Sequence, residues 1–591
     1  MDSDVIVAPE EQRMNVNAPH MCSQSPVPWI YVHNKANIVL GPVIGLVTHD
    51  SVRFLVESDQ TSKVNFTLVG RDRLGRRYHR AEVSAQLESH MPKSIYVDGL
   101  RSNYKYTVQC DQPMPRLANC CFKTLPRGQS RSLIDSSLRI ALVSGNDVSY
   151  VEQDPYQGAP RTVRRKSYAQ GTEHSLWRDL YQRICDDNLN MVIHVGNNLQ
   201  VGGSANRTLF ADMVDDDLNE LAAFRVIQQE YYKCWTETWA RHVLGSCSNV
   251  MIFSESDIGN LVKNNIEDKN PQNDLIARAT MLAYRCYQQA LWHDPHDEEP
   301  MYAKHIELSR YLSLLLVDFT TYPTLETDTP EVRDLFPPQT WKEIEKALPP
   351  VTRFDPEQYK DHDRSKGLPP GTQKGLLVVS TATFSDKNSI LQDPEYLPAA
   401  TAFLNKLFEW KTSDTKNMRE VCIVSAASRA SGYASGSYLI EDSLSHTYIT
   451  EFAVAPMAAP CKKPGALRGL VSNIAGKLTS SSVLTNGPFT FAPRYMHQGI
   501  HGYGVLTFGA LLGTTTRQTG EVTSDSFLTA SPVFWVETFQ TRAAKRPLTH
   551  EWAYFQHNLT IERTSCEDTY VPCPNYKWRK YLGLNKGPLC F

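Results

Sequence analysis

The stretch that decides the fold class is residues 137–143, SLRIALV. It is almost entirely apolar and lacks the alternation of a half-exposed strand, which is typical of a strand buried on both faces. Helix-period segments and further apolar strands alternate after it, and this predicts an α/β domain with functional loops at the carboxyl ends of its strands. The later predicted strands are residues 190–195, 249–253, 312–317, 375–379 and 421–424, and the predicted helices are residues 175–184, 209–243 (one or two helices), 275–292, 338–347 and 400–409.

Upstream of this domain, residues 38–126 carry short β-type runs separated by turn residues. The runs at residues 51–56, 64–69 and 94–97 each suit a half-buried strand. Tyr104 follows a turn and opens a further strand, and two interpretations of it are open. It is either a tyrosine corner, whose hydroxyl bonds back to the backbone, or an ordinary strand aromatic. Both interpretations predict a small β-sandwich of the fibronectin type III kind.

The domain organisation follows from changes in pattern along the 591 residues. We predict an N-terminal arm at residues 1–36, the β-sandwich at 37–126, the α/β domain at 137–563 and a C-terminal tail at 564–591. The two end segments lack the sustained apolar period of a core. We therefore expect both to be ordered by contact with the body or with a partner.

Composition and charge exclude several classes of protein. Lys and Arg number 61 and Asp and Glu 64, which gives a net charge of −3 and no broad basic surface for nucleic acid. No apolar run approaches the roughly 18 residues that span a bilayer, and the acidic N-terminus lacks an apolar signal segment. Thirteen cysteines at modest density fit a reducing compartment. We expect a cytoplasmic protein with protein partners, no nucleic acid and no membrane span.

Motifs at the predicted strand ends resemble those of the PhoD-like (alkaline phosphatase D) metallophosphatase family. The resemblance spans about residues 38–560 and implies a layered metallophosphatase-like domain of sheets and helices, preceded by a small sandwich. The matching segments, in the family's order, are residues 138–144, His194 to Gly196, residues 251–253 followed by Asp257, Trp341 after residues 338–339, residues 421–425, and residues 449–460.

Active members of this family hold two metal ions at the strand ends. Two cations about 3.5–4 Å apart need carboxylate and imidazole ligands, with a bridging hydroxide as the nucleophile. The family's first strand ends in Ser-Cys and its second in His-x-Gly-Asp-Gln-x-Tyr-x-Asp. In this chain Gly145 replaces the cysteine. The second motif has Asn197, Asn198, Gln200 and Gly202 where the resemblance implies Asp, Gln, Tyr and Asp.

The third motif of the family, Trp-Asp-Asp-His-Asp, is also altered. It corresponds here to Phe253 followed by Ser254, Glu255, Ser256 and Asp257, so a serine stands where an imidazole is implied. Glu255 and Asp257 are the anions that remain. Because neutral groups solvate a divalent cation only weakly, this motif alone cannot balance the charge of two ions.

The fourth motif, Ser-Gly-Asp-x-His, places Ala427 and Arg429 at the two implied ligand positions. Alanine has no ligating atom, and the guanidinium of Arg429 brings a permanent positive charge to a cation site. We expect Arg429 to pair with Asp257 or Glu255. The sequence therefore predicts a vestigial site that carries no catalytic residue, no metal and no cofactor.

Three functions remain open at this point. The first is a catalytically inactive pseudophosphatase that serves as a structural or interaction component of a large protein assembly, with a cytoskeletal, ciliary or flagellar host as one candidate. Residues 1–36 and 564–591 are then the expected contact sites. The second is a divergent metal-dependent phosphomonoesterase or phosphodiesterase. The third is a module that binds an anion through Arg429 and Asn197 without hydrolysing it.

Histidines outside these positions favour structural roles. His194 lies inside a predicted buried strand, so a core histidine hydrogen-bonded to the backbone is favoured over a metal ligand. The cluster at residues 293–299 contains Pro295, and we predict a solvated loop there.

Overall fold

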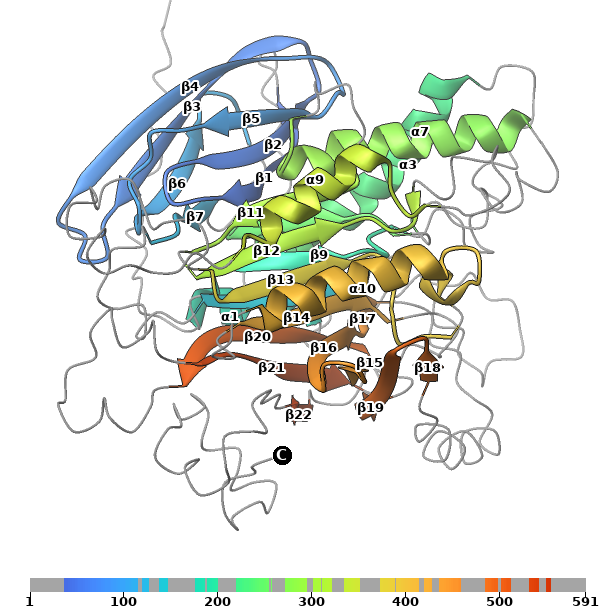
Figure 1. The fold of residues 1–591 in the computed structure, drawn as a ribbon. Coiled ribbons are helices and arrows are strands. Elements are labelled where there is room, and N and C mark those ends of the chain that lie inside the picture. Colours follow the sequence, from blue (N-terminus) through green and yellow to red (C-terminus); the bar gives the residue numbers. More distant parts are fainter. Residues whose placement is uncertain are drawn as a thin grey trace, which may run out of the picture.

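The computed structural model shows two connected bodies, an N-terminal pair of β-sheets and a larger mixed α/β body (Figure 1). The α/β class predicted from the sequence agrees with this architecture. The structure describes residues 37–114, 120–126, 138–146, 176–186, 189–199, 219–254, 257, 271–294, 301–309, 311–321, 334–350, 373–387, 389–413, 419–427, 435–458, 484–497, 501–511, 531–541 and 549–553.

Seven strands of the N-terminal region form two sheets that face each other across an apolar interior. Phe54 and Phe66 are fully buried there, with their ring centroids 5.2 Å apart in an edge-to-face arrangement. The closer assignment to the fibronectin type III kind stays a prediction. One sheet has the order β1 (Ile38–Val47), β2 (Val52–Ser58), β5 (Lys93–Val97), and the other has the order β4 (Tyr78–Leu87), β3 (Ser62–Arg71), β6 (Lys105–Cys110), β7 (Cys121–Lys123).

The tyrosine hydroxyl that bonds back to the backbone here belongs to Tyr106. It accepts a hydrogen bond from the backbone N–H of Arg101 at 2.8 Å and lies 2.9 Å from Nδ1 of His79. Tyr104 is a buried aromatic directly before β6, and the bond of a tyrosine hydroxyl to the backbone is made by Tyr106. Residues two apart in a strand share a face, which is why the sequence pattern did not separate these two tyrosines.

The larger body contains a sheet whose first three strands are parallel. β8 (Leu138–Asn146) pairs with β9 (Met191–Val195), and β9 pairs with β10 (Ser248–Ile252). On the other side of β8 the sheet continues through antiparallel strands, and a short strand also pairs with the end of β8. These added strands are β20 (His501–Leu511), β21 (Ser531–Thr541), β22 (Thr549–Ala553) and the short strand β17 (Pro456–Ala458).

The second sheet of the larger body has eight described strands, of which the second to the fifth in the sheet order are parallel. Its remaining strands pair antiparallel at the two sides. The order is β11 (Ala303–Glu307), β12 (Leu312–Val317), β13 (Gly375–Ser380), β14 (Glu420–Ala426), β16 (Thr447–Val454), β15 (Ser435–Asp442), β19 (Phe489–His497), β18 (Leu484–Asn486).

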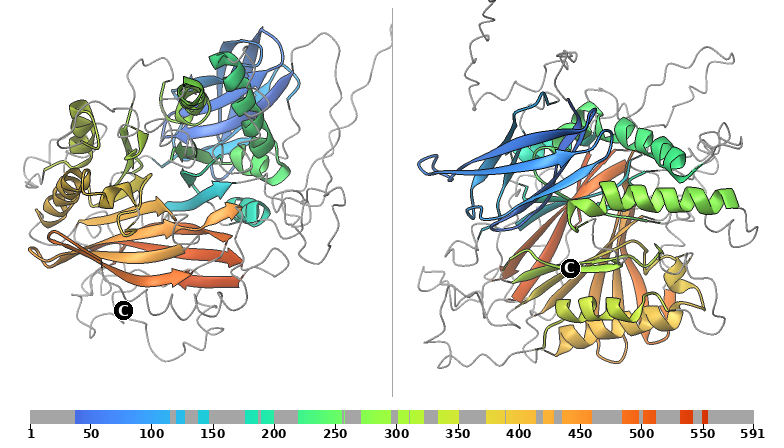
Figure 2. Two further views of the ribbon diagram at one scale, coloured as in Figure 1. Left: turned by 90° about the vertical axis from the view of Figure 1, so that its right-hand side faces the viewer. Right: turned by 90° about the horizontal axis from the view of Figure 1, so that it is seen from above.

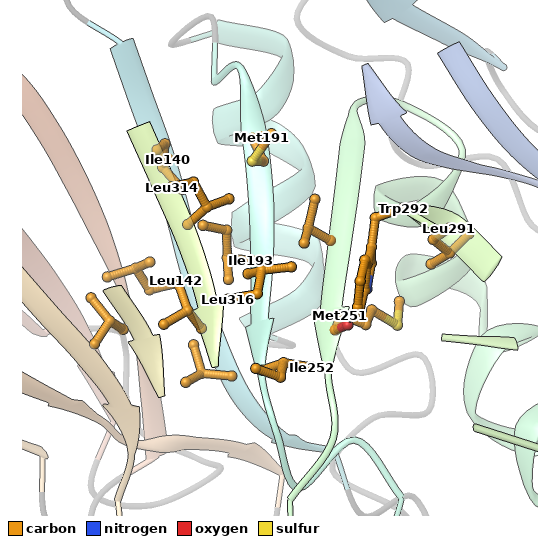
Figure 3. Close-up of a cluster of buried hydrophobic side chains, with 14 of the residues drawn as sticks. Ile140, Leu142, Met191, Ile193, Met251, Ile252, Leu291, Trp292, Leu314 and Leu316 are labelled. Carbon is orange, nitrogen blue, oxygen red and sulfur yellow. Dashed lines mark hydrogen bonds between the residues drawn. The ribbon is translucent and has the colours of Figure 1, made fainter. Parts of the chain in front are cut away.

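The two sheets of the larger body pack face to face, with helices on their outer faces (Figure 2). Ile140, Ile193 and Leu316 lie in the apolar layer between the sheets (Figure 3). The neighbouring residues of these strands point to the outer faces, because side chains alternate along a strand. The outer helices are α1 (Leu176–Asp186) and α4 (Thr238–Leu244) on the first sheet, and α9 (Pro338–Ala347) and α10 (Leu397–Thr412) on the second.

Two long helices join the N-terminal sheets to the larger body. α3 (Glu220–Trp235) and α7 (Pro271–Tyr287) pack against each other, and the rings of Tyr231 and Tyr287 stack with centroids 4.2 Å apart. The segment 209–243 thus holds two helices, α3 and α4, as far as the structure describes it. Glu237 separates them, because its side chain accepts hydrogen bonds from the first backbone N–H groups of α4.

A buried carboxylate lies at this junction. Glu57 of β2 is fully buried and accepts hydrogen bonds from the hydroxyls of Tyr232 and Tyr287 and from Nε2 of Gln228. Burial raises the pKa of Glu57, against the lowering effect of the two tyrosine hydrogen bonds.

Among the helices that the structure describes, none is long and apolar enough to cross a membrane.

Candidate functional site

The loops that follow β8, β9 and β10 emerge at one edge of the first sheet. The three strands are neighbours and run parallel, so their carboxyl ends lie side by side. Gly145, Asn197, Asn198, Ser254 and Asp257, which the sequence singled out, are all at this edge in the described structure.

At the end of β8, Gly145 adopts the left-handed conformation, with φ of 58°. A Cβ atom at this position would lie 2.5 Å from Cβ of Pro456, the first residue of β17. The backbone N–H of Gly145 and the hydroxyl of Ser144 both donate to the carbonyl of Gly196, at 3.4 and 3.3 Å. The position at which the family resemblance implies a cysteine is therefore packed against β17 and admits no side chain without a displacement of Pro456.

At the end of β9, Gly196 and Asn197 both have positive φ, at 69° and 55°. The hydroxyl of Ser254 accepts a hydrogen bond from the backbone N–H of Asn197 at 2.7 Å and donates to Oδ1 of Asn197 at 2.9 Å. A Cβ atom on Gly196 would lie 2.5 Å from Cβ of Ser254. The loop after β9 thus contacts the loop after β10 directly, and both the backbone and the side chain of Asn197 bond to Ser254.

Asp257 has a clear structural role in the loop after β10. Its side chain is 1% exposed. Oδ1 accepts the backbone N–H of Leu199 at 2.6 Å, and Oδ2 accepts the backbone N–H of Ser254 at 2.9 Å. Oδ2 also lies 3.2 Å from the hydroxyl of Ser254, whose one proton it shares with Oδ1 of Asn197. The carboxylate therefore fastens the loop after β9 to the loop after β10.

Asn198 points into the protein. Its Nδ2 donates to the carbonyl of Ile252 at 3.0 Å and to Oε1 of Gln288 at 2.7 Å, and Gln288 in turn donates to the hydroxyl of Tyr231 at 2.9 Å. Gln288 and Tyr231 were not predicted as partners of this edge. They lie on other elements, and no local pattern marks them.

His194 is a core histidine, as the sequence favoured. Its ring is buried, stacks on Trp177, and places Nε2 at 3.1 Å from Oδ1 of Asn249. The partner is a side chain, not the backbone that the sequence favoured. The two hydrogens on Nδ2 of Asn249 are directed at three backbone carbonyls, 2.8 to 3.1 Å away, so its oxygen faces His194 and the histidine carries its proton on Nε2.

Acidification is expected to destabilise the protein through His194. Burial lowers the pKa of His194 to about 4, below its ordinary value near 6.5. The unfolded chain therefore binds this proton more readily, and stability is lost as the pH falls from about 6.5 toward 4. Denaturant unfolding should show a loss of about 2 kcal/mol between about pH 7 and pH 5 from this group.

A His194→Gln variant is the control for that measurement. The free energy of unfolding of this variant should lack the loss that protonation of His194 causes between about pH 7 and pH 5. Burial also lowers the pKa of His242 to about 4, but His242 is present in both proteins and cancels in the comparison. Parallel pH profiles of the two proteins would contradict the prediction.

The fourth predicted motif lies on the second sheet, at the end of β14. Ala427 is buried, and its backbone N–H donates to the carbonyl of Val454 at 2.9 Å. The hydroxyl of Thr383 donates to the carbonyl of Ala426 at 2.8 Å. The backbone groups of Ala426 and Ala427 are thus hydrogen-bonded within the protein.

The remaining predicted positions, Gln200, Gly202, Glu255, Ser256 and Arg429, lie outside the described residues, as do the segments 1–36 and 564–591. The predicted pairing of Arg429 with an acid stays a prediction for that reason. Within the described ranges, no three or more His, Cys, Asp or Glu side chains are grouped so as to hold a metal ion.

One histidine prediction is wrong in part. His293 is 7% exposed and follows the short 3₁₀ helix η2 (Gln289–Leu291), so it belongs to the protein interior and not to a solvated loop. Its ring lies beside that of Trp292, whose indole N–H donates to the carbonyl of Met251 at 2.6 Å. Residues 295–299 of the predicted loop lie outside the described part of the chain.

Comparison with known proteins gives remote likenesses. No family model and no curated protein matches the sequence. A solved structure titled "Structure of PhoD" is similar over 88% of this chain and 93% of its own, at 12% identity and a TM-score of 0.48. A glycosyl hydrolase family 2 member from Bacteroides cellulosilyticus matches 39% of this chain and 33% of its own, at 11% identity and a TM-score of 0.17. Likenesses of this degree identify neither a family nor an activity.

Proposed function

We propose that this chain is a catalytically inactive protein with a metallophosphatase-like architecture that serves as a structural or interaction component of a larger protein assembly. The observation that carries the proposal is the direct bonding of Ser254 to Asn197 at the sheet edge, at 2.7 and 2.9 Å. Groups at positions of metal ligands in the resembled family bond here to one another and close the edge.

Charge supports the proposal. A pair of divalent cations needs several anionic ligands around it. Asp257 is the one acid among the described residues of the loops after β8, β9, β10 and β14. Both of its oxygens accept hydrogen bonds from the loop backbone. The described residues therefore do not fit a two-metal centre.

The packing around Gly145 also supports the proposed inactivity. A ligand side chain at residue 145 would need the space that Pro456 fills, and the residue would also have to hold a positive φ. A left-handed conformation costs an L-residue roughly 1–2 kcal/mol. Return of the implied cysteine to this position would thus meet both a steric and a conformational cost.

The assembly role extends the proposal to the ends of the chain. Segments 1–36 and 564–591 lack the apolar period of an independent core. Such segments gain order by adding contact area to another surface. A cytoplasmic host with a cytoskeletal, ciliary or flagellar lattice is the setting that we propose.

Metal content and hydrolysis test the proposal. The full-length protein is incubated with manganese, zinc, iron or calcium, desalted and analysed by mass spectrometry for bound metal. The same samples are assayed with p-nitrophenyl phosphate and bis-p-nitrophenyl phosphate. We expect less than one metal ion per chain and no turnover above that of buffer.

Bound metal at two ions per chain, together with turnover, would overturn the proposal. The matched variants Asp257→Asn and Glu82→Gln then locate the activity, because Glu82 is an exposed acid on the outer edge of the sandwich. Turnover that Asp257→Asn abolishes and Glu82→Gln leaves intact would identify a divergent phosphatase.

A further inference from the structure

A cluster of cations lies on the hairpin between β3 and β4. Residues 71–80, RDRLGRRYHR, contain five arginines and one aspartate in a chain whose net charge is −3. Leu74 and Tyr78 of the same hairpin are 68% and 61% exposed. Exposed aromatic and arginine side chains together are typical of protein-binding surfaces.

The turn of the hairpin holds the arginines outward. Its one carboxylate, Asp72, accepts the backbone N–H of Arg76 at 2.7 Å, and the backbone N–H of Gly75 donates to the Asp72 carbonyl at 2.9 Å. Gly75 has a φ of 68°, a conformation that glycine adopts without strain. Arg73, Arg76 and Arg77 are exposed, and no carboxylate of the described residues forms an ion pair with them.

Further cations continue across the sheet in register with the hairpin. Arg71 of β3 is the cross-strand partner of Lys105 in β6, and Lys105 is the partner of Lys123 in β7. Like charges directly opposite each other destabilise a sheet. Burial lowers the pKa of Lys123, and the charge of Arg73 lowers it further, so the cations act on one another. Lys105 and Lys123 lie on the strands farther from the free edge of β4, so they add to the positive potential of this sheet without contacting a strand added to β4.

The hairpin also carries a free strand edge. β4 is the outermost strand of its sheet, at the margin of the sandwich in Figure 1, and pairs with β3 alone among the described strands. In an antiparallel pair, alternate residues direct both backbone N–H and C=O away from the partner. The opposite edge differs, because the backbone N–H of Cys121 in β7 donates to the carbonyl of Gly245.

We propose that this cationic edge, defined as β4 and the hairpin at residues 71–80, binds an extended acidic polypeptide segment that adds to β4 as a further strand. The arginines of the hairpin supply charge complementarity, and the edge supplies backbone hydrogen bonds. A nucleic acid or an anionic membrane would satisfy the charges and leave the backbone groups of β4 unpaired. Because the exposed arginines and the free backbone edge of β4 lie together, an acidic polypeptide is favoured over the other two classes of partner.

This surface is on the sandwich and does not depend on the proposed inactivity of the strand-end loops. A catalytic chain could carry it equally. Binding measurements on the cationic edge and metal measurements on the strand ends consequently succeed or fail separately.

Fluorescence anisotropy with the full-length protein tests the proposal. The probe is a fluorescein-labelled decapeptide that alternates Glu and Val, compared with the same peptide N-methylated at each Val. N-methylation keeps the charge and removes the backbone donors of one edge. We expect the methylated peptide to bind roughly tenfold more weakly, equivalent to about 1.4 kcal/mol.

Charge-reversal variants locate the binding. Arg76→Glu with Arg77→Glu should weaken the peptide roughly tenfold, whereas Lys342→Glu with Lys387→Glu, an equal reversal at exposed lysines elsewhere, should leave the affinity within about twofold. Equal binding of the methylated peptide, or equal loss in both double variants, would overturn the proposal. Tighter binding of a ten-residue oligothymidylate or of phosphatidylserine vesicles would also overturn it and assign the surface to that class.

Discussion

Replacement of Glu57 by alanine should lower the free energy of unfolding by about 3 kcal/mol. The carboxylate is fully buried between β2 and the helices α3 and α7. It accepts the hydroxyl of Tyr287 at 2.8 Å and Nε2 of Gln228 at 3.1 Å, and it also accepts the hydroxyl of Tyr232. Alanine removes the shared acceptor and leaves these donors facing one another. Urea unfolding of the full-length protein, followed by tryptophan fluorescence, measures the loss.

Two variants control this experiment. Glu57→Gln keeps the shape and one acceptor, and it removes the need to bury a charge, so we expect a loss of about 1 kcal/mol. Glu82→Ala removes an exposed acid that pairs with Arg80 at 2.6 Å, and a pair of this kind contributes little. An unfolding curve of Glu57→Ala that coincides with that of Glu82→Ala would show that the junction does not depend on the carboxylate.

Replacement of Asp257 by alanine should cost a similar amount, about 3 kcal/mol. Its carboxylate accepts the backbone N–H groups of Leu199 and Ser254, at 2.6 and 2.9 Å, and is buried. Alanine leaves both N–H groups without this acceptor and releases the loop after β9 from the loop after β10. Hydrogen exchange should show loss of protection at the amides of Leu199 and Ser254, alongside the lower stability.

Asp257→Asn is the matched control. An asparagine retains one carbonyl oxygen and presents an amide to the other backbone N–H, so its loss should fall between those of the wild type and Asp257→Ala. Unchanged exchange at Leu199 in the alanine variant would contradict the role that we assign to this carboxylate.

Strand positions in the larger body were predictable from local pattern. The predicted strands at 190–195 and 375–379 correspond to β9 (Met191–Val195) and β13 (Gly375–Ser380). Both are completely buried, so every residue faces apolar surroundings and the run of apolar residues is continuous. The strands β11 and β15 and those after residue 484 were not predicted. β20 is buried over residues 501–508, but Gly502, Gly504 and Thr507 interrupt its apolar run.

The sequence predicted where the residues of the candidate site lie in the fold, and it did not predict the hydrogen-bond partners of their side chains. The motif resemblance singled out Gly145, Asn197, Ser254 and Asp257, and the apolar runs before them placed these residues at strand ends. It expected Asp257 to face a cation or an arginine. The described contacts of its carboxylate are with Ser254 and with Leu199, which lies 58 residues away, and its pairing with Arg429 stays a prediction. Local spacing holds no information about a partner so distant in the chain.

The alternation of apolar strands and amphipathic helices can be recognised from the amino-acid sequence, because each buried element has apolar residues at its own period. The division of the strands between two sheets, the pairing of β20 with β8 and the position of Pro456 beside Gly145 are visible in the folded chain alone. These outcomes depend on which apolar faces meet, and many pairings of faces satisfy the same local pattern. Their selection is a property of the whole packed molecule.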